Sequence, residues 1–321
     1  MSTSLPSGAD IPAAYRRSSS YSRVLSDRSA KRGRPVQSLS CRASLLSSTR
    51  SEQARRFRPP ESALLMESVP TLAGLPEHEP MLVHVGIRRL RDRWGVSTAD
   101  ASELLLERLL EREPSQLFVP SFTYSFTQTG QFSRATTPAE VGGFSEHIRS
   151  TRDPVLRTLD PVFSCIDALD SGFNRGELNE EAFGERSIWH RWDSVDGLIV
   201  NIGLEHLVST QVHYVEHLAR VPYRYEKAFA GRVVDDVAGI THSANYRYTV
   251  RDLAEDPRMD FPKRRDILES SRVLHAFEWE GVEVTYLRAR ALRSVLERAF
   301  AADPRAILQH RDRRPRGLTD G

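Results

Sequence analysis

Two short apolar segments separated by an amphipathic helix constrain the fold of this chain more than any other feature. MLVHVGI (81–87) is predicted to be a short buried strand that ends at Gly86 and is followed by a turn. QLFVPSFTYSF (116–126) is predicted to be a second strand, broken by its proline. Between them, VSTADASELLLERLLER (96–112) has the spacing of an amphipathic helix, with Ser97 or Thr98 as its N-cap. The order strand, helix, strand favours an α/β domain in which the two strands are parallel neighbours.

The remainder of the chain extends this α/β pattern and then becomes rich in strands. GLIVNIGL (197–204) is the clearest buried strand, and STQVHYVEHLARV (209–221) is predicted to be the helix that follows it, capped by Ser209 or Thr210. After residue 223, alternating aromatic and polar residues predict strands. The other predicted elements are a helix over 137–150, an apolar segment over 161–169, a strand over 244–253, and a hairpin around Glu280 and Gly281 followed by a helix within 272–300.

The first 65 residues differ in composition from the rest. They contain 12 Lys and Arg against 4 Asp and Glu, are rich in Ser, and show no sustained apolar period. Such a segment cannot bury enough surface to offset its ordering entropy. We therefore predict a disordered basic arm over 1–65, a folded domain over 66–312 and a basic tail over 313–321. The arm is interpreted as a targeting peptide, a contact segment or an extension without function.

The basic character of the chain belongs to its two ends. The whole chain has a formal net charge of +2, yet residues 66–310 hold 29 Lys and Arg against 37 Asp and Glu. Nucleic-acid binding needs a basic face for the phosphates, so no nucleic-acid partner is expected. An acidic domain suits a small cationic substrate.

Cysteine usage and hydropathy indicate the compartment. Cys41 falls in the basic arm and Cys165 in an apolar run of the predicted domain, so a structural disulfide is not expected. No run of about 18 apolar residues occurs, so no contact with a membrane is expected. We predict a cytoplasmic protein that is a monomer or a homodimer.

The stretch HYVEH (213–217) matches the H-x-x-E-H pattern of one class of zinc proteases. A zinc site would use His213 and His217 with a third protein ligand and an open position for water. The alternative needs no metal, because His213 and Glu216 are three residues apart on a helix and can face the same cleft. A third interpretation is that the segment is a surface helix whose polar residues form no site.

The surroundings of this helix contain several motifs in a recognisable order. The glycine of NIG (201–203) is followed by T-x-x-H-x-x-E at residues 210–216, and then by VPYRYEK (221–227). Upstream stand RTLDPVFS (157–164), FGERSIWHRW (183–192) and LFVPSFTYSF (117–126). In this order the motifs resemble those of the aminoglycoside 3-N-acetyltransferase family, also called the antibiotic N-acetyltransferase family, over residues from about 80 to about 310.

Two motifs depart from the pattern of that family. The family reads V-H-S-S-L after its first strand, whereas this chain has VHVGIRRL, which retains His84 but replaces the two hydroxyl residues by Val85 and Gly86. The backbone amide of Gly86 could still contact the donor. In the upstream block, Asp160 replaces the family's histidine. The departures point to a divergent branch that works on an amino sugar or a biosynthetic intermediate.

The resemblance implies a fold, a reaction and a set of roles. The fold would be α/β, with a central mixed sheet flanked by helices and a β-rich C-terminal part. The reaction would transfer an acyl group from acetyl-CoA to an amine of an aminoglycoside or related amino sugar, without a metal and without an acyl-enzyme. His213 would be the general base, and the carboxylates of Glu216 and Asp160 would be the other catalytic groups. An alternative interpretation of Asp160 is a turn residue of an Asp-Pro pair.

The same resemblance assigns the contacts with the two substrates. The loop after the first strand and the upstream block would bind the donor, through His84, Val85, Gly86, Thr158 and Ser164. Thr210, beside its role as a cap, and Arg157 would position the substrate. Two other functions remain open, a zinc hydrolase that uses His213 and His217 and a non-catalytic family member that acts through its basic arm.

Overall fold

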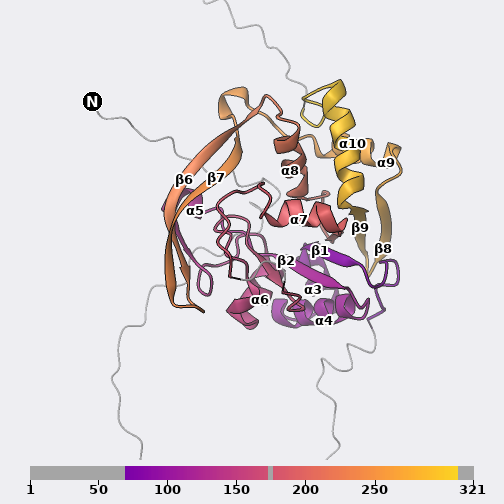
Figure 1. Ribbon diagram of the computed structural model, residues 1–321. Helices are drawn as coiled ribbons and strands as arrows, with labels where there is room; N and C mark the ends of the chain where they lie inside the picture. The colour runs from indigo at the N-terminus through magenta and orange to yellow at the C-terminus, as the bar shows by residue number, and fades with distance from the viewer. Residues whose placement is uncertain (1–68, 173–175, 310–321) are drawn as a thin grey trace, which may run out of the picture.

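A mixed sheet of six strands forms the centre of the computed structural model, which describes residues 69–172 and 176–309 (Figure 1). The strand order is β4-β2-β1-β5-β9-β8. Strand β1 is parallel to both β2 and β5, and the remaining neighbours are antiparallel. The strands are β1 (Pro80–Val85), β2 (Gln116–Pro120), β4 (Cys165–Asp167), β5 (Leu198–Ile202), β8 (His275–Trp279) and β9 (Val282–Arg288).

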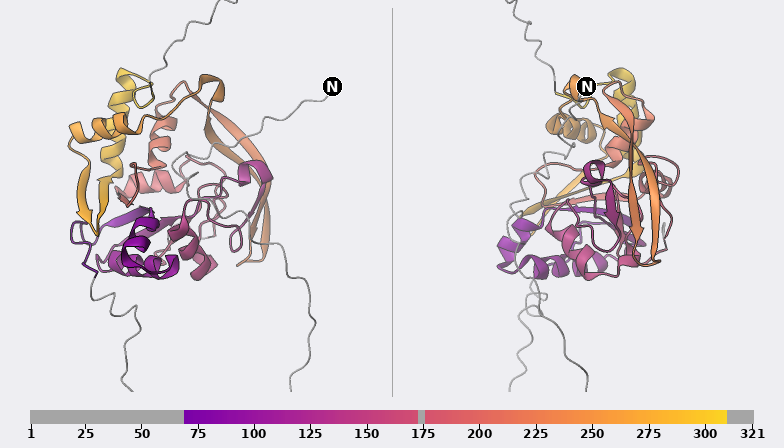
Figure 2. Two further views of the ribbon diagram at one scale, coloured as in Figure 1. Left: turned by 180° about the vertical axis from the view of Figure 1, so that it is seen from behind. Right: turned by 90° about the vertical axis from the view of Figure 1, so that its left-hand side faces the viewer.

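Helices cover both faces of this sheet (Figures 1 and 2). Helices α3 (Ile87–Trp94), α4 (Thr98–Leu110) and α6 (Gly143–Thr151) cover one face, and α7 (Ile188–Val195), α8 (Gln211–Leu218) and α10 (Ala289–Ala302) cover the other, with α9 (Phe261–Ser270) beside α10. Side chains of a strand alternate between faces. Accordingly Met81, Val83 and Val85 of β1 pack with the first group of helices, whereas Leu82 packs with the second. The result is a three-layer domain with two cores.

A long hairpin adds a second sheet at the side of the second core. Strands β6 (Arg224–Asp235) and β7 (Ile240–Arg251) pair over their whole lengths, and β3 (Gln131–Ser133) pairs with β6. The buried hairpin residues Val233, Ala244, Tyr246 and Tyr248 join the second core. The remaining short helices are α5 (Phe126–Thr129), η1 (Pro154–Leu156) and η2 (Leu253–Glu255). This sheet brings the residues after α8 back over that helix.

The structure confirms the predicted α/β class with a mixed sheet and a β-rich C-terminal part, and most predicted elements within it. Ser97 caps α4 by accepting a hydrogen bond from the Asp100 amide at 3.1 Å, and the turn of the β8–β9 hairpin falls at Glu280 and Gly281 as predicted. None of the helices within 69–172 and 176–309 is both long and apolar enough to cross a membrane.

Two local predictions differ from the structure. The strand predicted to end at Gly86 ends at Val85, and the Gly86 amide donates to the Ile202 carbonyl at 2.8 Å, but Ile87 begins helix α3 where a turn was expected. The helix expected from residue 137 begins only at Gly143. Before that point the chain is held as a loop, because the Ala139 amide donates to the Glu146 carboxylate at 2.7 Å.

Candidate active site

Helix α8 holds the best candidate for a catalytic group, because a buried strand and a fixed loop place it. Strand β5 ends at Ile202, and Gly203 turns the chain with a φ of 66°. The following loop is pinned by the Val208 amide, which donates to the Asn201 side-chain oxygen at 2.7 Å. The predicted cap is half right, since Ser209 accepts from the Gln211 amide at 3.1 Å while Thr210 makes no capping hydrogen bond through its side chain.

Four side chains from α8 and the start of β6 form a buried polar cluster. Glu216 is fully buried, and its Oε2 lies 2.6 Å from His213 Nδ1. Its Oε1 accepts a hydrogen bond from the Tyr223 hydroxyl at 2.8 Å, and Arg224 Nε lies 2.8 Å from Oε2 as an ion pair. Arg224 Nη2 also lies 2.9 Å from His213 Nδ1. One carboxylate therefore holds a histidine, a tyrosine and an arginine at once.

The charges in this cluster set the protonation states. Burial, and then the charge of Arg224, lower the pKa of His213 to about 4, although Glu216 acts in the opposite direction. Burial alone would raise the pKa of Glu216, but Arg224, His213 and Tyr223 together lower it to about 2. At neutral pH the imidazole is therefore uncharged and the carboxylate ionised. Burial and the nearby Glu216 raise the pKa of the Tyr223 hydroxyl, so it stays protonated.

His213 opens onto a cavity of about 330 Å³, and its side chain is 20% exposed. Thr210 and Glu216 line the same cavity, so the structure brings these three predicted site residues together. The size suits part of a small-molecule ligand. The other lining residues are Tyr124, Val208, Ser209, Tyr223, Arg224, Tyr248, Arg251, Pro257, Arg258, Met259, Phe261, Arg264, Leu308 and Gln309.

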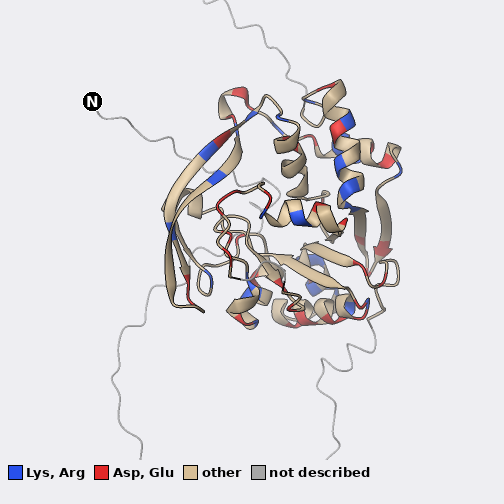
Figure 3. Ribbon diagram, in the orientation of Figure 1, with Lys and Arg blue, Asp and Glu red and all other residues tan. Residues whose placement is uncertain are grey.

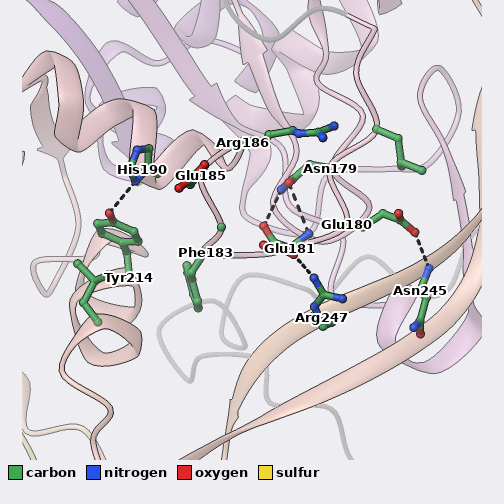
Figure 4. Close-up of a pocket in the computed structure, with 13 residues that line it drawn as sticks. Asn179, Glu180, Glu181, Phe183, Glu185, Arg186, His190, Tyr214, Asn245 and Arg247 are labelled. Atoms are coloured by element: carbon green, nitrogen blue, oxygen red, sulfur yellow. Dashed lines mark hydrogen bonds and ion pairs between the residues drawn. The ribbon is translucent and has the colours of Figure 1, made fainter.

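A second and wider cavity of about 820 Å³ lies on the other side of α8 (Figure 4). Tyr214 of α8 faces it, and its hydroxyl lies 3.2 Å from His190 Nδ1 on α7. The loop before α7 contributes most of the remaining wall, including Glu181, which pairs with Arg247 of β7. Successive residues of α8 thus face two different cavities.

The predicted donor-binding block, RTLDPVFS, does not reach either of these cavities. Arg157 is buried, and its guanidinium donates to the carbonyls of Ser121 at 2.9 Å, Thr137 at 2.6 Å and Arg134 at 3.1 Å. Ser164 donates to the Ser121 carbonyl at 2.7 Å and accepts from Arg157. This network joins loops to strand β4, which gives both residues a structural role.

Two further residues of that block are likewise occupied. The hydroxyl oxygen of Thr158 accepts from the Cys165 amide at 3.0 Å. Asp160 is buried and accepts from the Val162 and Phe163 amides, from the Tyr246 hydroxyl and from Asn179. Burial raises the pKa of Asp160. The structure does not bring Asp160 to His213, and its hydrogen bonds are those of the alternative reading, a turn residue.

The predicted donor loop at 84–86 is also built into the sheet. His84 is 2% exposed and packs edge-on against Phe122, and burial lowers the pKa of its imidazole to about 3. Val85 is buried at the end of β1. The Gly86 amide donates to the Ile202 carbonyl, so in this conformation its hydrogen bond is already made within the sheet.

The two histidines of HYVEH face different surroundings. His217 lines a small cavity of about 270 Å³ with Arg220 and Glu226, and its Nδ1 is hydrogen-bonded with the Thr249 hydroxyl at 2.7 Å. His213 Nδ1 is engaged with Glu216. In the part of the chain that the structure describes, no group of three or more His, Cys, Asp and Glu is arranged to hold a metal ion.

Sequence reasoning missed several residues of the His213 cavity. Tyr223 and Arg224 lie within the VPYRYEK motif, which marked the segment without giving these side chains a role. Arg251, at the end of β7, and Arg258, in the loop before α9, carried no sequence signal. They reach the cavity only because the β6–β7 hairpin returns over α8, and that pairing could not be read from local pattern.

Comparison with known proteins identifies the family. The family model described as aminoglycoside 3-N-acetyltransferase matches residues 82–301. The chain belongs to the aminoglycoside 3-N-acetyltransferase family, as its motifs indicated. The protein is accordingly an enzyme of the N-acetyltransferase class. A search of curated protein sequences found no match.

Solved structures share the fold at low sequence identity. A histidine-to-alanine mutant of aminoglycoside acetyltransferase AAC(3)-IVa with gentamicin has 20% identity and a TM-score of 0.58, covering 78% of this chain and 91% of that one. AAC-VIa with sisomicin has 20% identity and a TM-score of 0.58, covering 75% and 97%. AAC-IIIb with CoASH has 16% identity and a TM-score of 0.56, covering 73% and 93%.

Proposed function

We propose that this enzyme transfers an acetyl group from acetyl-CoA to an amine of an aminoglycoside or related amino sugar, with His213 as the general base. The buried His213–Glu216 pair on the wall of a cavity is the observation that carries the proposal. The neighbouring structures named above support the two substrates, since one holds CoASH and two hold aminoglycosides.

The geometry of the pair suits proton removal from an attacking amine. With its Nδ1 proton donated to Glu216 at 2.6 Å, the neutral imidazole keeps the Nε2 lone pair for the substrate. The amine nitrogen attacks the thioester carbon, the C–N bond forms, and Nε2 takes the amine proton. The C–S bond breaks, and the imidazolium returns this proton to the leaving thiolate, so that the coenzyme is released as the thiol and the base is regenerated. Glu216 stabilises the imidazolium while it exists, as the buried carboxylate does in other histidine-based sites.

Direct transfer without an acyl-enzyme agrees with the state of the described thiol. Cys165 is fully buried, and its Sγ contacts the Phe163 carbonyl at 3.7 Å. Burial raises the pKa of this thiol well above its ordinary value, and a thiolate is the nucleophilic form. Thr210, whose side chain makes no cap, is the hydroxyl on the His213 wall that we assign to substrate positioning.

The test is amine-dependent thiol release from acetyl-CoA by the full chain. We expect His213→Ala to lower turnover by about 100-fold or more, the usual size of general-base effects, with an unchanged circular dichroism spectrum. His275→Ala is the matched control, because His275 is exposed on β8 and lines neither cavity. Turnover of His213→Ala equal to that of the control would remove the base assignment.

A further inference from the structure

The cavity at His213 is lined by an excess of positive charge. Four arginines line it, namely Arg224, Arg251, Arg258 and Arg264, against the single carboxylate of Glu216. That carboxylate is already engaged by His213, Tyr223 and Arg224. Figure 3 shows basic residues at the end of the β6–β7 hairpin nearest α8. The charge of this cavity is therefore opposite to that expected for a polycationic ligand.

Two of these arginines face each other across the hairpin. Arg224 of β6 and Arg251 of β7 are direct partners in the antiparallel register. Like charges in this arrangement repel one another. Glu216 forms an ion pair with Arg224 and is shared with His213, and both arginines line the cavity beside the candidate base. The charge of Arg251 also contributes to the low pKa of His213.

A third arginine is buried in the wall without a carboxylate partner among the described residues. Arg264 of α9 is 2% exposed, donates to the Leu207 carbonyl and lies over the Phe261 ring at 5.1 Å. Its Nε makes no hydrogen bond within the described chain. Burial lowers the pKa of Arg264 to about 10, so it remains a cation at neutral pH. A buried guanidinium with an unused donor, beside a cavity, is typical of a site that a ligand anion completes.

The fourth arginine and the start of α8 complete the same wall. Arg258 has a side chain that is 71% exposed, and its Nε lies 3.2 Å from the carboxylate of Asp256, which is 64% exposed. Ser209 and Thr210, at the N-terminus of α8, add hydroxyl groups, and a helix N-terminus favours negative charge. The wider cavity differs, because three carboxylates line it, those of Glu180, Glu181 and Glu185.

We propose that the cavity at His213 is an anion site that binds a phosphate or carboxylate group of a substrate through Arg251, Arg258 and Arg264. This inference rests on the proposed function only for the statement that the bound molecule is a substrate. Two sources carry the required chemistry: an acidic group on the amine acceptor, and the phosphates of the coenzyme. Either source distinguishes this cavity from one built for the ammonium groups of an aminoglycoside.

The first experiment measures binding without catalysis. Inorganic pyrophosphate is titrated calorimetrically into the full chain, into the double variant Arg251→Gln/Arg258→Gln, and into Arg298→Gln. Arg298 is the control, since it is an exposed arginine of α10 outside the cavity. We expect the double variant to bind pyrophosphate at least tenfold more weakly and the control to bind as the unchanged chain does. Equal affinity in all three proteins, or no pyrophosphate binding by the unchanged chain, would overturn the anion site.

The second experiment separates the two sources. Steady-state KM values are measured with acetyl-CoA and with acetylpantetheine, which lacks the phosphates, and with glucosamine and glucosamine 6-phosphate as acceptors. A rise in KM of the double variant confined to acetyl-CoA assigns the site to the coenzyme, and a rise confined to glucosamine 6-phosphate assigns it to the acceptor. A rise of the same size for charged and uncharged substrates would overturn the proposal in favour of a structural role.

The two experiments also keep this inference distinct from the proposed function. If no pair of substrates gives thiol release, but pyrophosphate binds and the double variant loses that binding, acetyl transfer fails and the anion site stands. If thiol release requires His213 but the arginine variants change neither affinity nor KM, acetyl transfer stands and the anion site fails.

Discussion

At the scale of single residues, the protonation of His213 depends on two opposite charges at one ring nitrogen. Nδ1 lies 2.6 Å from Glu216 and 2.9 Å from Arg224. The carboxylate favours the imidazolium and the guanidinium opposes it, and burial adds to the second effect. The resulting pKa of about 4 keeps the base ready at neutral pH. The same balance makes Arg224 a positioning residue whose effect appears in the pH profile.

Removal of the Arg224 charge should move the acid limb of the pH–rate profile upward. In the unchanged enzyme the base is lost as the pH falls through the pKa of about 4. In Arg224→Met, Glu216 is no longer neutralised, so the pKa of His213 rises and the fall in kcat/KM should begin at a higher pH than in the unchanged enzyme. The measurement is kcat/KM from pH 4 to 8. Arg224→Lys keeps the charge and should keep the limb low; an unmoved limb in Arg224→Met would contradict this account.

The His213–Glu216 pair could be predicted from the sequence, whereas the two side chains that hold Glu216 in place could not. Helical spacing of three residues was enough to place His213 and Glu216 on one face, and the structure puts them in contact. The hydroxyl of Tyr223 and the guanidinium of Arg224 meet Glu216 through the turn between α8 and β6, which has no periodic signal. Asp160 matched a motif position, yet its carboxylate already accepts hydrogen bonds from nearby backbone amides and a tyrosine hydroxyl. These hydrogen bonds are visible only in the three-dimensional structure.

At the scale of elements, Arg157 acts as a brace between loops and strand β4. Its guanidinium donates to three carbonyls from two loops, those of Ser121, Arg134 and Thr137, and lies over Phe132 at 4.9 Å. Burial lowers the pKa of Arg157 to about 9, which shows how far it is removed from water. These hydrogen bonds fix the backbone of the loops, and Arg157 itself lines neither of the two larger cavities.

Arg157→Met should therefore reduce stability rather than substrate affinity. The variant leaves buried carbonyls without donors, at a cost of about 1–3 kcal/mol each, so we expect a loss of more than about 3 kcal/mol in the free energy of unfolding. The measurement is urea unfolding, together with KM for both substrates at a temperature where the variant is folded. Arg298→Met on the exposed face of α10 should change stability by less than about 0.5 kcal/mol. A raised KM with unchanged stability would restore the substrate-positioning role that the sequence suggested.

The element boundaries show where local pattern stops being informative. Ile87 and Leu90 are buried and three residues apart, which is a helical spacing, but the apolar run before them dominates the sequence signal. Strand β1 ends at Val85, and the next residue must be a glycine because an added Cβ at Gly86 would lie 2.5 Å from the Gly203 carbonyl oxygen. That close approach joins β1 to the end of β5, two segments more than 100 residues apart, so no local window could contain it.

At the scale of the whole molecule, two buried neutral histidines tie stability to pH. The pKa values of His84 and His213 are lowered to about 3 and about 4, chiefly by burial. Both values lie below the ordinary value of about 6.5, so the unfolded chain binds more protons as the pH falls below 6.5. Stability is complete above pH 6.5 and is lost progressively toward pH 4 and 3.

This linkage predicts a specific change in one variant. Between pH 7.5 and 5, His213 should account for a loss of roughly 2 kcal/mol in the free energy of unfolding. In His213→Gln that pH-dependent loss should be smaller by the same amount, while in His275→Gln, at an exposed site, it should be unchanged. Urea titrations at the two pH values measure it. A loss of equal size in His213→Gln and in the unchanged chain would show that His213 is not buried as a neutral group.

The first and last buried side chains of the two cores indicate how much of the chain the fold needs. Val69, Leu72 and Leu75 are buried against the first core, and the Trp279 indole donates to the Pro70 carbonyl at 3.1 Å. At the other end, Leu308 is buried in the second core. Among the described residues, the two cores therefore use side chains from Val69 to Leu308, which lie inside the segment 66–312. We propose that this segment is the complete catalytic unit and that the arm over 1–65 is dispensable for the reaction.

Two fragments test the proposal at its most sensitive point. Fragment 66–312 should match the full chain in melting temperature and, within about twofold, in kcat/KM, because it keeps every buried residue named above. Fragment 77–312 removes three buried apolar side chains, each worth about 1.5–3 kcal/mol, and exposes the cluster around Trp279, so it should be unfolded or should melt at a much lower temperature. Loss of activity in 66–312 with an unchanged melting temperature would instead give the first 65 residues a direct part in the reaction, and stable folding of 77–312 would place the true boundary after Leu75.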